Sequence, residues 1–415
     1  MSHPDLRLAA AKSSLVPWLI PTAFFALGGF WGSWNASLAG VQSHFHLSNT
    51  GLGILLAIGV SVGAIAGAAA SHVGRHARPV HLLAVILLIW GVLLLPLASE
   101  HRFVWFALSF TAVQIVMGTV DSVMNVGATA ALAGRPGALV RFHAIFNVGA
   151  MAGALGTGLL PTAGNGGSLL WTWLALALLG ATGLWATTAR NTLDPRLANN
   201  VHVGLPSPTA DMDLYEETLR DGSIFEILRR DRLVGLLVIF AAAALVEGGV
   251  FTWGVLYLRT ELHIGLLVGA SAYALGNLVA GLGRVLGGPL IGTRTPLRAL
   301  AVGSIVTGIG LLIEAHTHIE VLAAAMLALT AAGVSLNWPL LMADVSARSS
   351  SPSSSVGAFT AAGYLGWVAG APLIGIVADH WSLSAGITGI ALLSFVIAVA
   401  AAWLIGRDTI TGCRE

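Results

Sequence analysis

The chain has 415 residues, of which 56% are hydrophobic and 9% are charged, and its mean hydropathy is +0.84. Soluble domains carry roughly 25% charged residues, so this composition excludes a soluble globular protein. The net charge of +1 gives no indication of nucleic-acid binding, and we expect none. The single cysteine, Cys413, allows neither an internal disulfide nor a cysteine-based metal site.

Twelve apolar segments are long enough to cross a bilayer, which takes about 20 helical residues. The first resembles a signal peptide because Arg7 and Lys12 precede it. It runs on to about residue 39, however, and eleven similar segments follow, which favours an uncleaved first span. The predicted spans are 15–39, 51–71, 79–98, 103–131, 140–162, 168–188, 233–258, 266–291, 298–316, 319–343, 355–378 and 382–406.

The basic residues set the direction of these spans. If the N-terminus is cytoplasmic, all of the 20 arginine and lysine residues except Arg102 and Arg259 fall on the inner side. Such a bias is typical of cytoplasmic loops. We therefore expect a multi-pass membrane protein with an even number of spans and both termini in the cytoplasm.

One long polar stretch, residues 189–232, divides the spans into six and six. It contains three prolines and then the charged run YEETLRDGSIFEILRRD, which predicts a short amphipathic helix on the inner surface. The predicted organisation is an N-terminal six-helix bundle at 1–188, a central cytoplasmic loop at 189–232 that acts as a tether, and a C-terminal six-helix bundle at 233–415. The predicted fold class is an all-α membrane protein with twelve transmembrane helices in two six-helix bundles.

Small residues recur at a fixed place in this plan. The second helix of each group of three spans has glycines four residues apart, a spacing that lets helix backbones approach closely. Repeated three-helix units are typical of secondary transporters that alternate access around a site at the membrane midplane. The glycines are Gly59, Gly63, Gly67, Gly149, Gly153, Gly283, Gly287, Gly366 and Gly370.

The first helix of each three-span unit carries conspicuous polar groups. Facing lipid, these groups would lack hydrogen-bond partners, so we expect them to line one central cavity. Amides can hydrogen-bond a small polar solute and indole faces can stack on it. The alternative for the tryptophans is packing or anchoring at the membrane interface. The expected substrate-binding residues are Trp34, Asn35, Gln114, Asn125, Trp253, Asn337 and Trp338.

Two acids, Asp121 and Glu247, are the deepest in the predicted membrane. Asp121 is about ten residues from the inner end of its span, which corresponds to about 15 Å. Intramembrane carboxyl groups are functional candidates by default, and burial lets such a group gain and lose a proton near neutral pH. We expect Glu247, Asp121 or both to couple protons to transport. The alternative is a structural role, for Asp121 a helix–helix hydrogen bond with Asn125 or Asn147.

Three basic residues are candidates for gating. Arg75 follows the second span, His143 begins the fifth, and Arg284 lies in the inner half of the eighth. For Arg284 the alternative is snorkelling to the cytoplasmic surface. For His143 the alternative is a packing role.

Several apparent motifs carry no chemistry in this context. GVSVG (59–63) matches the G-x-S-x-G of hydrolases, but it lies inside a spanning helix and not on a strand-to-helix turn. The sequence contains neither a P-loop nor H-E-x-x-H. We therefore expect no enzyme activity, no cofactor and no metal.

The whole chain resembles the major facilitator superfamily. The signature after the second span of that family, roughly G-x-x-x-D-[RK]-x-G-[RK], is here GAAASHVGR (67–75), which keeps both glycines and Arg75 but has Ser71 and His72 at the charged positions. The R-x-x-Q-G of the fourth span is here QIVMG, with Gln114 in place of arginine. The resemblance implies two six-helix bundles around a cavity lined by spans 1, 4, 7 and 10.

More specific motifs resemble the fucose-permease-like branch of this superfamily, which includes bacterial inner-membrane permeases, so the resemblance implies a place in the inner membrane. The resemblance implies proton-coupled sugar uptake, although the first span has no acid and Asn35 is the nearest polar residue. The motifs are VDSVMN (120–125), GRP and RFHAIFNVGAMAGA within 134–154, EGGVFTWGVLYL (247–258), GLGRVLGG (281–288) and GYLGWVAGAPLIG (363–375).

The predicted function is secondary active transport of a small polar solute, such as a sugar, by proton symport. Efflux by proton antiport is a close alternative, because the same acids serve either direction. A transporter-like receptor or sensor is the alternative of another class. The expected partners are the solute, protons and membrane lipid, and the chain is expected to be monomeric.

Overall fold

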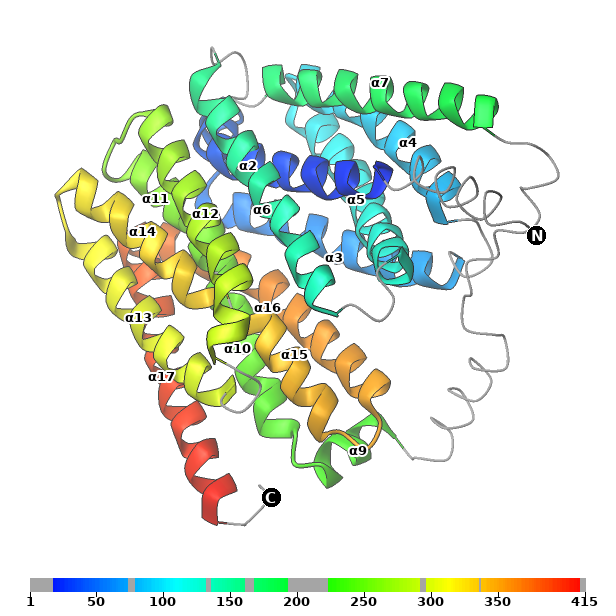
Figure 1. Cartoon of the computed structure of the whole chain (residues 1–415). Helices are drawn as coiled ribbons and strands as arrows, with labels where there is room; N and C mark the ends of the chain where they lie inside the picture. The colour runs from blue at the N-terminus through cyan, green and yellow to red at the C-terminus, as the bar shows by residue number, and fades with distance from the viewer. Residues whose placement is uncertain are drawn as a thin grey trace, which may run out of the picture.

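The structure is a computed structural model (Figure 1), and it describes residues 18–73, 79–131, 136–160, 168–192, 223–291, 296–335 and 337–410. All regular elements in these ranges are helices. Among them, nine helices are long and apolar enough to cross a membrane. The helices α2, α6 and the α14–α15 pair lie beside these nine and bring the path to twelve crossings. The predicted fold class is thereby confirmed.

The first half of the chain forms six crossings, one helix each. Within it α2 packs on α6, α3 on α5, and α4 on α7. The bounds are α2 (Leu19–His44), α3 (Asn49–Val73), α4 (Pro79–Ser99), α5 (Phe103–Ala131), α6 (Pro136–Leu159) and α7 (Ser168–Thr192).

The second half begins with the short helix α9 (Ile224–Arg230), where the sequence predicts an amphipathic helix. A capping box fixes its start: the Ser223 hydroxyl accepts the Glu226 N–H, and the Glu226 carboxylate accepts the Ser223 N–H. The six crossings that follow are α10 (Val234–Gly249) with η2 (Val250–Gly254) and α11 (Val255–Thr260), α12 (Leu266–Ile291), α13 (Pro296–His316), α14 (Glu320–Val334) with α15 (Asn337–Arg348), α16 (Pro352–His380) and α17 (Leu383–Ile410).

Two of these crossings are less regular than the sequence predicts. The tenth is divided at Ser335, which ends α14. Pro339 follows four residues later, and a proline has no N–H to donate to the Ser335 carbonyl. The seventh contains the π-helical turn η2 at Val250–Gly254. Such turns are often found at functional sites.

Glycines bring helix backbones into direct contact, as their spacing predicts. A Cβ added at Gly153 of α6 would lie 2.0 Å from the Gly29 oxygen of α2, and one at Gly118 of α5 would lie 1.9 Å from the Gly63 oxygen of α3. In the second half, a Cβ at Gly366 of α16 would lie 2.1 Å from the Ala241 oxygen of α10. No larger residue fits these positions without moving a helix.

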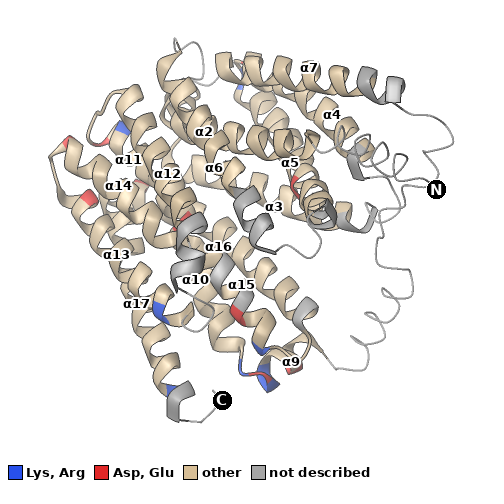
Figure 2. Cartoon of the chain, in the orientation of Figure 1, with Lys and Arg blue, Asp and Glu red and all other residues tan. Residues whose placement is uncertain are grey.

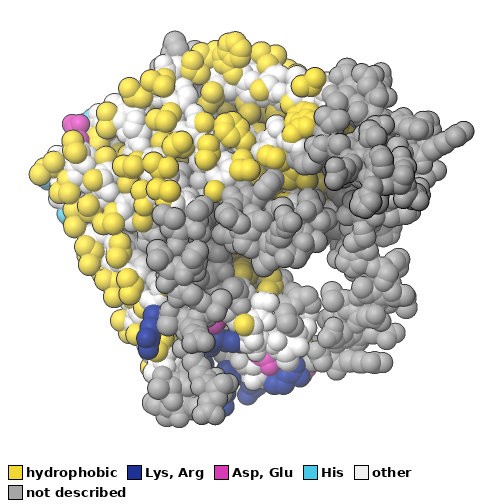
Figure 3. Space-filling model, in the orientation of Figure 1, with side chains coloured by type: hydrophobic (Ala, Val, Ile, Leu, Met, Phe, Trp, Pro, Cys, Tyr) yellow, Lys and Arg dark blue, Asp and Glu magenta, His cyan; other side chains and the backbone are white. Residues whose placement is uncertain are grey.

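The surface of the bundle is apolar around its middle and charged at its ends. Figure 2 shows that most of the described Lys, Arg, Asp and Glu residues lie near helix ends, with a group of basic residues at α9. Figure 3 shows hydrophobic side chains over the broad face of the bundle. The exposed hydrophobic residues of the described chain include Ile65, Val321 and Val399. This belt suits contact with lipid tails.

The two halves lie side by side, with α2 to α7 in one and α10 to α17 in the other (Figure 1). They meet along α3 with α16 and along α6 with α12. We call the end of the bundle that carries α9 the α9 side, and the opposite end, where α16 closes with Asp379, the Asp379 side.

Candidate functional site

The halves are joined tightly on the Asp379 side. The Asp379 carboxylate at the end of α16 accepts the backbone N–H groups of Asn49 (2.9 Å) and Thr50 (2.8 Å) at the start of α3. The first N–H groups of a helix have no partner within the helix, and they carry partial positive charge. One carboxylate therefore caps a helix that belongs to the other half.

Glycines complete this contact between α3 and α16. A Cβ added at Gly375 would lie 2.4 Å from the Asn49 oxygen, and one at Gly53 would lie 2.5 Å from the Ala371 oxygen. The two backbones touch, so the Asp379 side is closed. Opening it requires these contacts and the Asp379 cap to separate together.

A second seam joins α6 to α12. Near the Asp379 side, a Cβ added at Gly158 would lie 2.9 Å from the Ala270 Cβ. Deeper in the bundle, the buried Asn147 packs its side chain against Gly281, where an added Cβ would lie 3.3 Å from the Asn147 Cβ. The two main seams between the halves are therefore α3 with α16, the second and eleventh crossings, and α6 with α12, the fifth and eighth.

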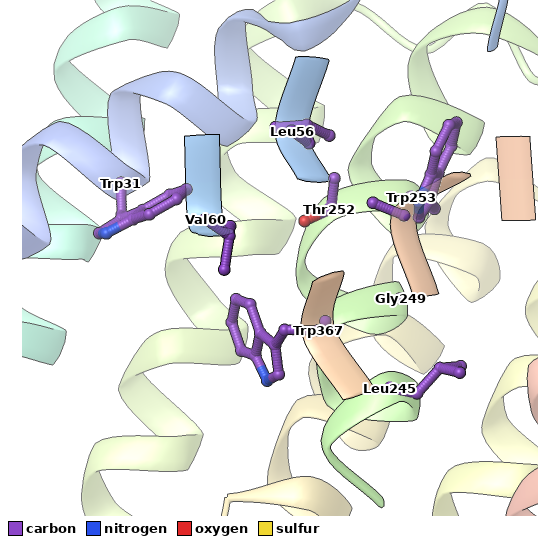
Figure 4. A pocket seen from close by; sticks show the side chains of 10 residues that line it. Trp31, Leu56, Val60, Leu245, Gly249, Thr252, Trp253 and Trp367 are labelled. Carbon is purple, nitrogen blue, oxygen red and sulfur yellow. The ribbon is translucent and has the colours of Figure 1, made fainter. Parts of the chain in front are cut away.

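A small pocket lies between the halves, about midway along α2 (Figure 4). Among its lining residues, the indole Nε1 atoms of Trp253 and Trp367 are buried and have no hydrogen-bond partner within the described part of the chain. Thr252 adds a hydroxyl group. The lining residues are Trp31, Leu56 and Val60 from the first half, and Leu245, Gly248, Gly249, Thr252, Trp253, Trp367 and Ala371 from the second.

One hydrogen bond between buried side chains crosses the interface close to this pocket. The Asn35 Nδ2 donates to the Tyr273 hydroxyl of α12 at 3.1 Å and to the Trp31 carbonyl at 2.9 Å. The Asn35 Oδ1 is buried and accepts no hydrogen bond from any residue that the structure describes. Asn35 was predicted as a site residue, whereas Tyr273 was missed, because nothing in its own segment indicates which residue it meets.

Asp121 and Asn125 form a pair on α5. The Asn125 Nδ2 donates to the Asp121 carbonyl at 2.8 Å and to the Asp121 Oδ1 at 3.1 Å. This is one of the structural hydrogen bonds that the sequence left open, although it lies within one helix. Tyr364 of α16, in the second half, lies near enough for the charge of Asp121 to act on its hydroxyl.

Glu247 and Trp253 lie on the crossing that lines the pocket. Glu247 is buried near the end of α10, directly before the pocket residue Gly248. Trp253 is buried on η2 and lines the pocket itself. The structure thus places Trp253 at the interface between the halves, and Glu247 one residue before a pocket residue.

The other predicted residues of the first half lie away from the pocket. Trp34 is enclosed by aromatic rings of its own half, with ring centroids 4.2 Å from Phe110 and 5.7 Å from Trp171. Gln114 is buried against α3, where a Cβ added at Gly59 would lie 3.0 Å from its Cγ. Both positions have the surroundings of packing residues.

In the second half, Asn337 is buried at the start of α15. Trp338 packs edge-on against Phe240, with ring centroids 4.8 Å apart, and meets Tyr364 at 6.4 Å. Tyr364 therefore connects Trp338 to the neighbourhood of Asp121.

The three gating candidates are not placed by the structure. Arg75 lies outside the described residues. His143 belongs to α6 and Arg284 to α12, but their side chains also lie outside the described part of the chain.

Twelve crossings in two halves, with buried polar side chains where the halves meet and one side closed, define a membrane transporter. Residues 19–371 match the model of the Major Facilitator Superfamily, and the chain belongs to this family of secondary transporters. It is 25% identical over 387 residues to an uncharacterised MFS-type transporter of Yersinia pestis, covering 91% of this chain and 93% of the relative.

Solved structures share the fold at low sequence identity. A bacterial homologue of the human lysosomal transporter Spinster, in an inward-facing and unoccupied conformation, has a TM-score of 0.74 and 14% identity, with 96% of this chain and 98% of that chain covered. The nucleoside transporter NupG (D323A mutant) has a TM-score of 0.69 and 14% identity, with 95% and 98% covered. At these identities the likeness concerns the fold alone.

Proposed function

We propose that this protein is a proton-coupled symporter that moves a small polar solute by alternating access. The observation that carries the proposal is the Asn35–Tyr273 hydrogen bond, which joins the two halves beside a pocket lined from both sides. A polar contact between halves can break and reform as they rock around a central site. The closed Asp379 side fits one end state of such a cycle.

The pocket favours a sugar-like solute. Trp31, Trp253 and Trp367 offer indole faces that can stack on the apolar face of a sugar ring, and Thr252 offers a hydroxyl. The indole Nε1 atoms of Trp253 and Trp367 are donors that a hydroxylated solute could satisfy. We assign the chain to the fucose-permease-like branch on its sequence motifs, and these side chains support that assignment.

Proton coupling is assigned to Asp121 and Glu247. Glu247 is buried and directly precedes the pocket residue Gly248, and the charge of Asp121 acts on Tyr364 of the other half. A carboxylate at a moving interface changes its solvation as the halves separate, so its proton affinity can follow the conformation. The basic residues near α9 support a cytoplasmic α9 side and insertion in the inner membrane.

The test is solute flux into liposomes that contain the purified protein, under an imposed proton gradient. A thermal-shift screen of sugars and other small polar solutes selects the labelled compound. Symport predicts uptake when the outside is acidic, and Glu247→Gln and Asp121→Asn should make uptake independent of the gradient. Uptake that keeps its dependence on the gradient in both variants would refute the assigned coupling. Export of the solute driven by the proton gradient would instead indicate antiport. Binding of the solute without any flux would indicate a receptor.

A further inference from the structure

Glu314, near the end of α13, is the most completely enclosed acid in the described part of the chain. Its exposed fraction is 0%, and neither of its carboxyl oxygens has a hydrogen-bond partner among the described residues. An ionised carboxylate without partners is very costly in such a place, and a protonated carboxyl is far less so. The geometry therefore favours the protonated acid in this conformation.

The carboxyl group of Glu314 touches the π-helical turn η2. A Cβ added at Gly254, the last residue of η2, would lie 3.2 Å from the Glu314 Oε1. The preceding residue, Trp253, lines the central pocket. Glu314 and the pocket therefore contact neighbouring residues of one π-helical turn.

Among the residues that the structure describes, no cation is paired with the Glu314 carboxyl group. On α11, the Tyr257 hydroxyl donates to the Ala315 carbonyl at 3.1 Å, and Glu261 follows as another acid at the helix end. Arg259 is directed elsewhere, since its guanidinium donates to the Ile264 carbonyl at 2.7 Å. The facing part of α17 contributes the hydroxyl of Ser384, which also donates to the Ala315 carbonyl, at 2.7 Å.

Two further titratable groups complete these surroundings. His316 of α13 is exposed, and its Nε2 lies 3.2 Å from the Thr388 hydroxyl of α17. Glu320 is exposed at the start of α14. Since α13 ends two residues after Glu314, the acid is about 3 Å along the helix axis from the Asp379 side.

We propose that Glu314 is a proton-binding site, separate from the central pocket, that exchanges its proton with the Asp379 side and acts on the crossing α10–η2–α11 through Gly254. Loss of the proton requires water at the carboxylate, and water can enter only if η2 moves away from α13. Protonation therefore favours the closed Asp379 side, and deprotonation favours its opening. This inference rests on the proposed proton coupling but assigns a residue outside the helices expected to line the cavity.

The direct test is infrared difference spectroscopy of the protein in lipid, which detects the carbonyl stretch of protonated carboxyl groups. At neutral pH the wild type should show a band that Glu314→Gln lacks and Glu314→Asp shifts. Glu320→Gln is the matched control, because the same change at an exposed glutamate should leave the band intact. Thermal unfolding of each variant checks that the fold is retained.

An unchanged band in Glu314→Gln would overturn the proposal, as would loss of the band in Glu320→Gln. A second readout is uptake as a function of pH, which should flatten in Glu314→Gln and stay as in the wild type in Glu320→Gln. The spectrum needs no transport. If the wild type shows the Glu314 band but no proton-driven flux, the proposed symport fails while the proton site stands.

Discussion

At the scale of single residues, Asp379 is the acid whose carboxylate joins the two halves. Asp379→Asn removes the negative charge and one of the two acceptor oxygens that hold Asn49 and Thr50. A partly exposed cap of this kind stabilises by about 1 kcal/mol, so the closed population should fall by about fivefold relative to the open one. The measurement is the labelling rate of a cysteine placed near the pocket, for example at Thr252, in a background that lacks Cys413. A labelling rate from the Asp379 side equal to that of wild type would show that the cap does not hold the closed state.

Asp231, between α9 and α10, gives a prediction for pH dependence. Its carboxylate accepts the Ser350 N–H at 2.7 Å and the hydroxyls of Ser350 and Ser349 at 2.8 and 3.2 Å. Burial alone raises the pKa of Asp231, but the hydrogen bonds from Ser350 and Ser349, with Arg230, outweigh it and lower the pKa below its ordinary value.

A lowered pKa means that this stabilisation is present above the unfolded-state pKa of about 3.9 and is lost as the pH falls through the lower folded value. Asp231→Asn should therefore lower the midpoint temperature of unfolding at neutral pH. As the pH falls, this midpoint should decrease less in the variant than in the wild type. Thermal unfolding of the protein in detergent between neutral and strongly acidic pH measures this difference. An equal acid loss in both proteins would contradict the account.

At the scale of elements, the contact of α3 with α16 predicts a steric effect. Gly375→Ala places a methyl group against the backbone of Asn49, so the closed Asp379 side cannot form as it is. Overpacking of this kind costs roughly 1–3 kcal/mol, and uptake should fall roughly tenfold. Gly357→Ala on the same helix is the control, because nothing lies within 4 Å of that position. Equal uptake by the two variants would contradict a closing contact at Gly375.

Most elements could be predicted from the sequence because hydropathy alone determines where a chain crosses a membrane. The predicted spans at 103–131 and 266–291 coincide with α5 and α12. The break in the tenth crossing after Ser335 could also be predicted from the sequence, because Pro339 cannot donate a backbone hydrogen bond there. The π-helical turn η2 could not be predicted from the sequence. Several glycines surround it, but no residue type in this segment specifies a π-helical turn over an α-helical one.

The candidate site was less accessible to prediction, for a different reason. Asn35 and Trp253 were expected from their polarity or ring in an apolar span, whereas Tyr273 becomes notable only through its contact with the opposite half. Glu314 and Asp379 fall at the ends of predicted spans, where an acid suggests nothing more than the membrane edge. The surroundings of Glu314 and Asp379 depend on how the helices align with one another, and a hydropathy pattern does not predict this alignment.

At the scale of the whole molecule, two halves closed on one side predict a rocking motion. Labels at Arg102 and His318 report the separation of the halves on the Asp379 side, and labels at Ala69 and Arg229 report it on the α9 side. All four positions are exposed. Because the halves move about a common interface, the two distances should change in opposite directions.

The most direct test of alternating access is single-molecule energy transfer between these label pairs in lipid. We expect two populations for each pair. Asp379→Asn should increase the population with a long distance between Arg102 and His318 and a short distance between Ala69 and Arg229. A single distance for each pair, unchanged by the variant, by pH and by solute, would contradict the account.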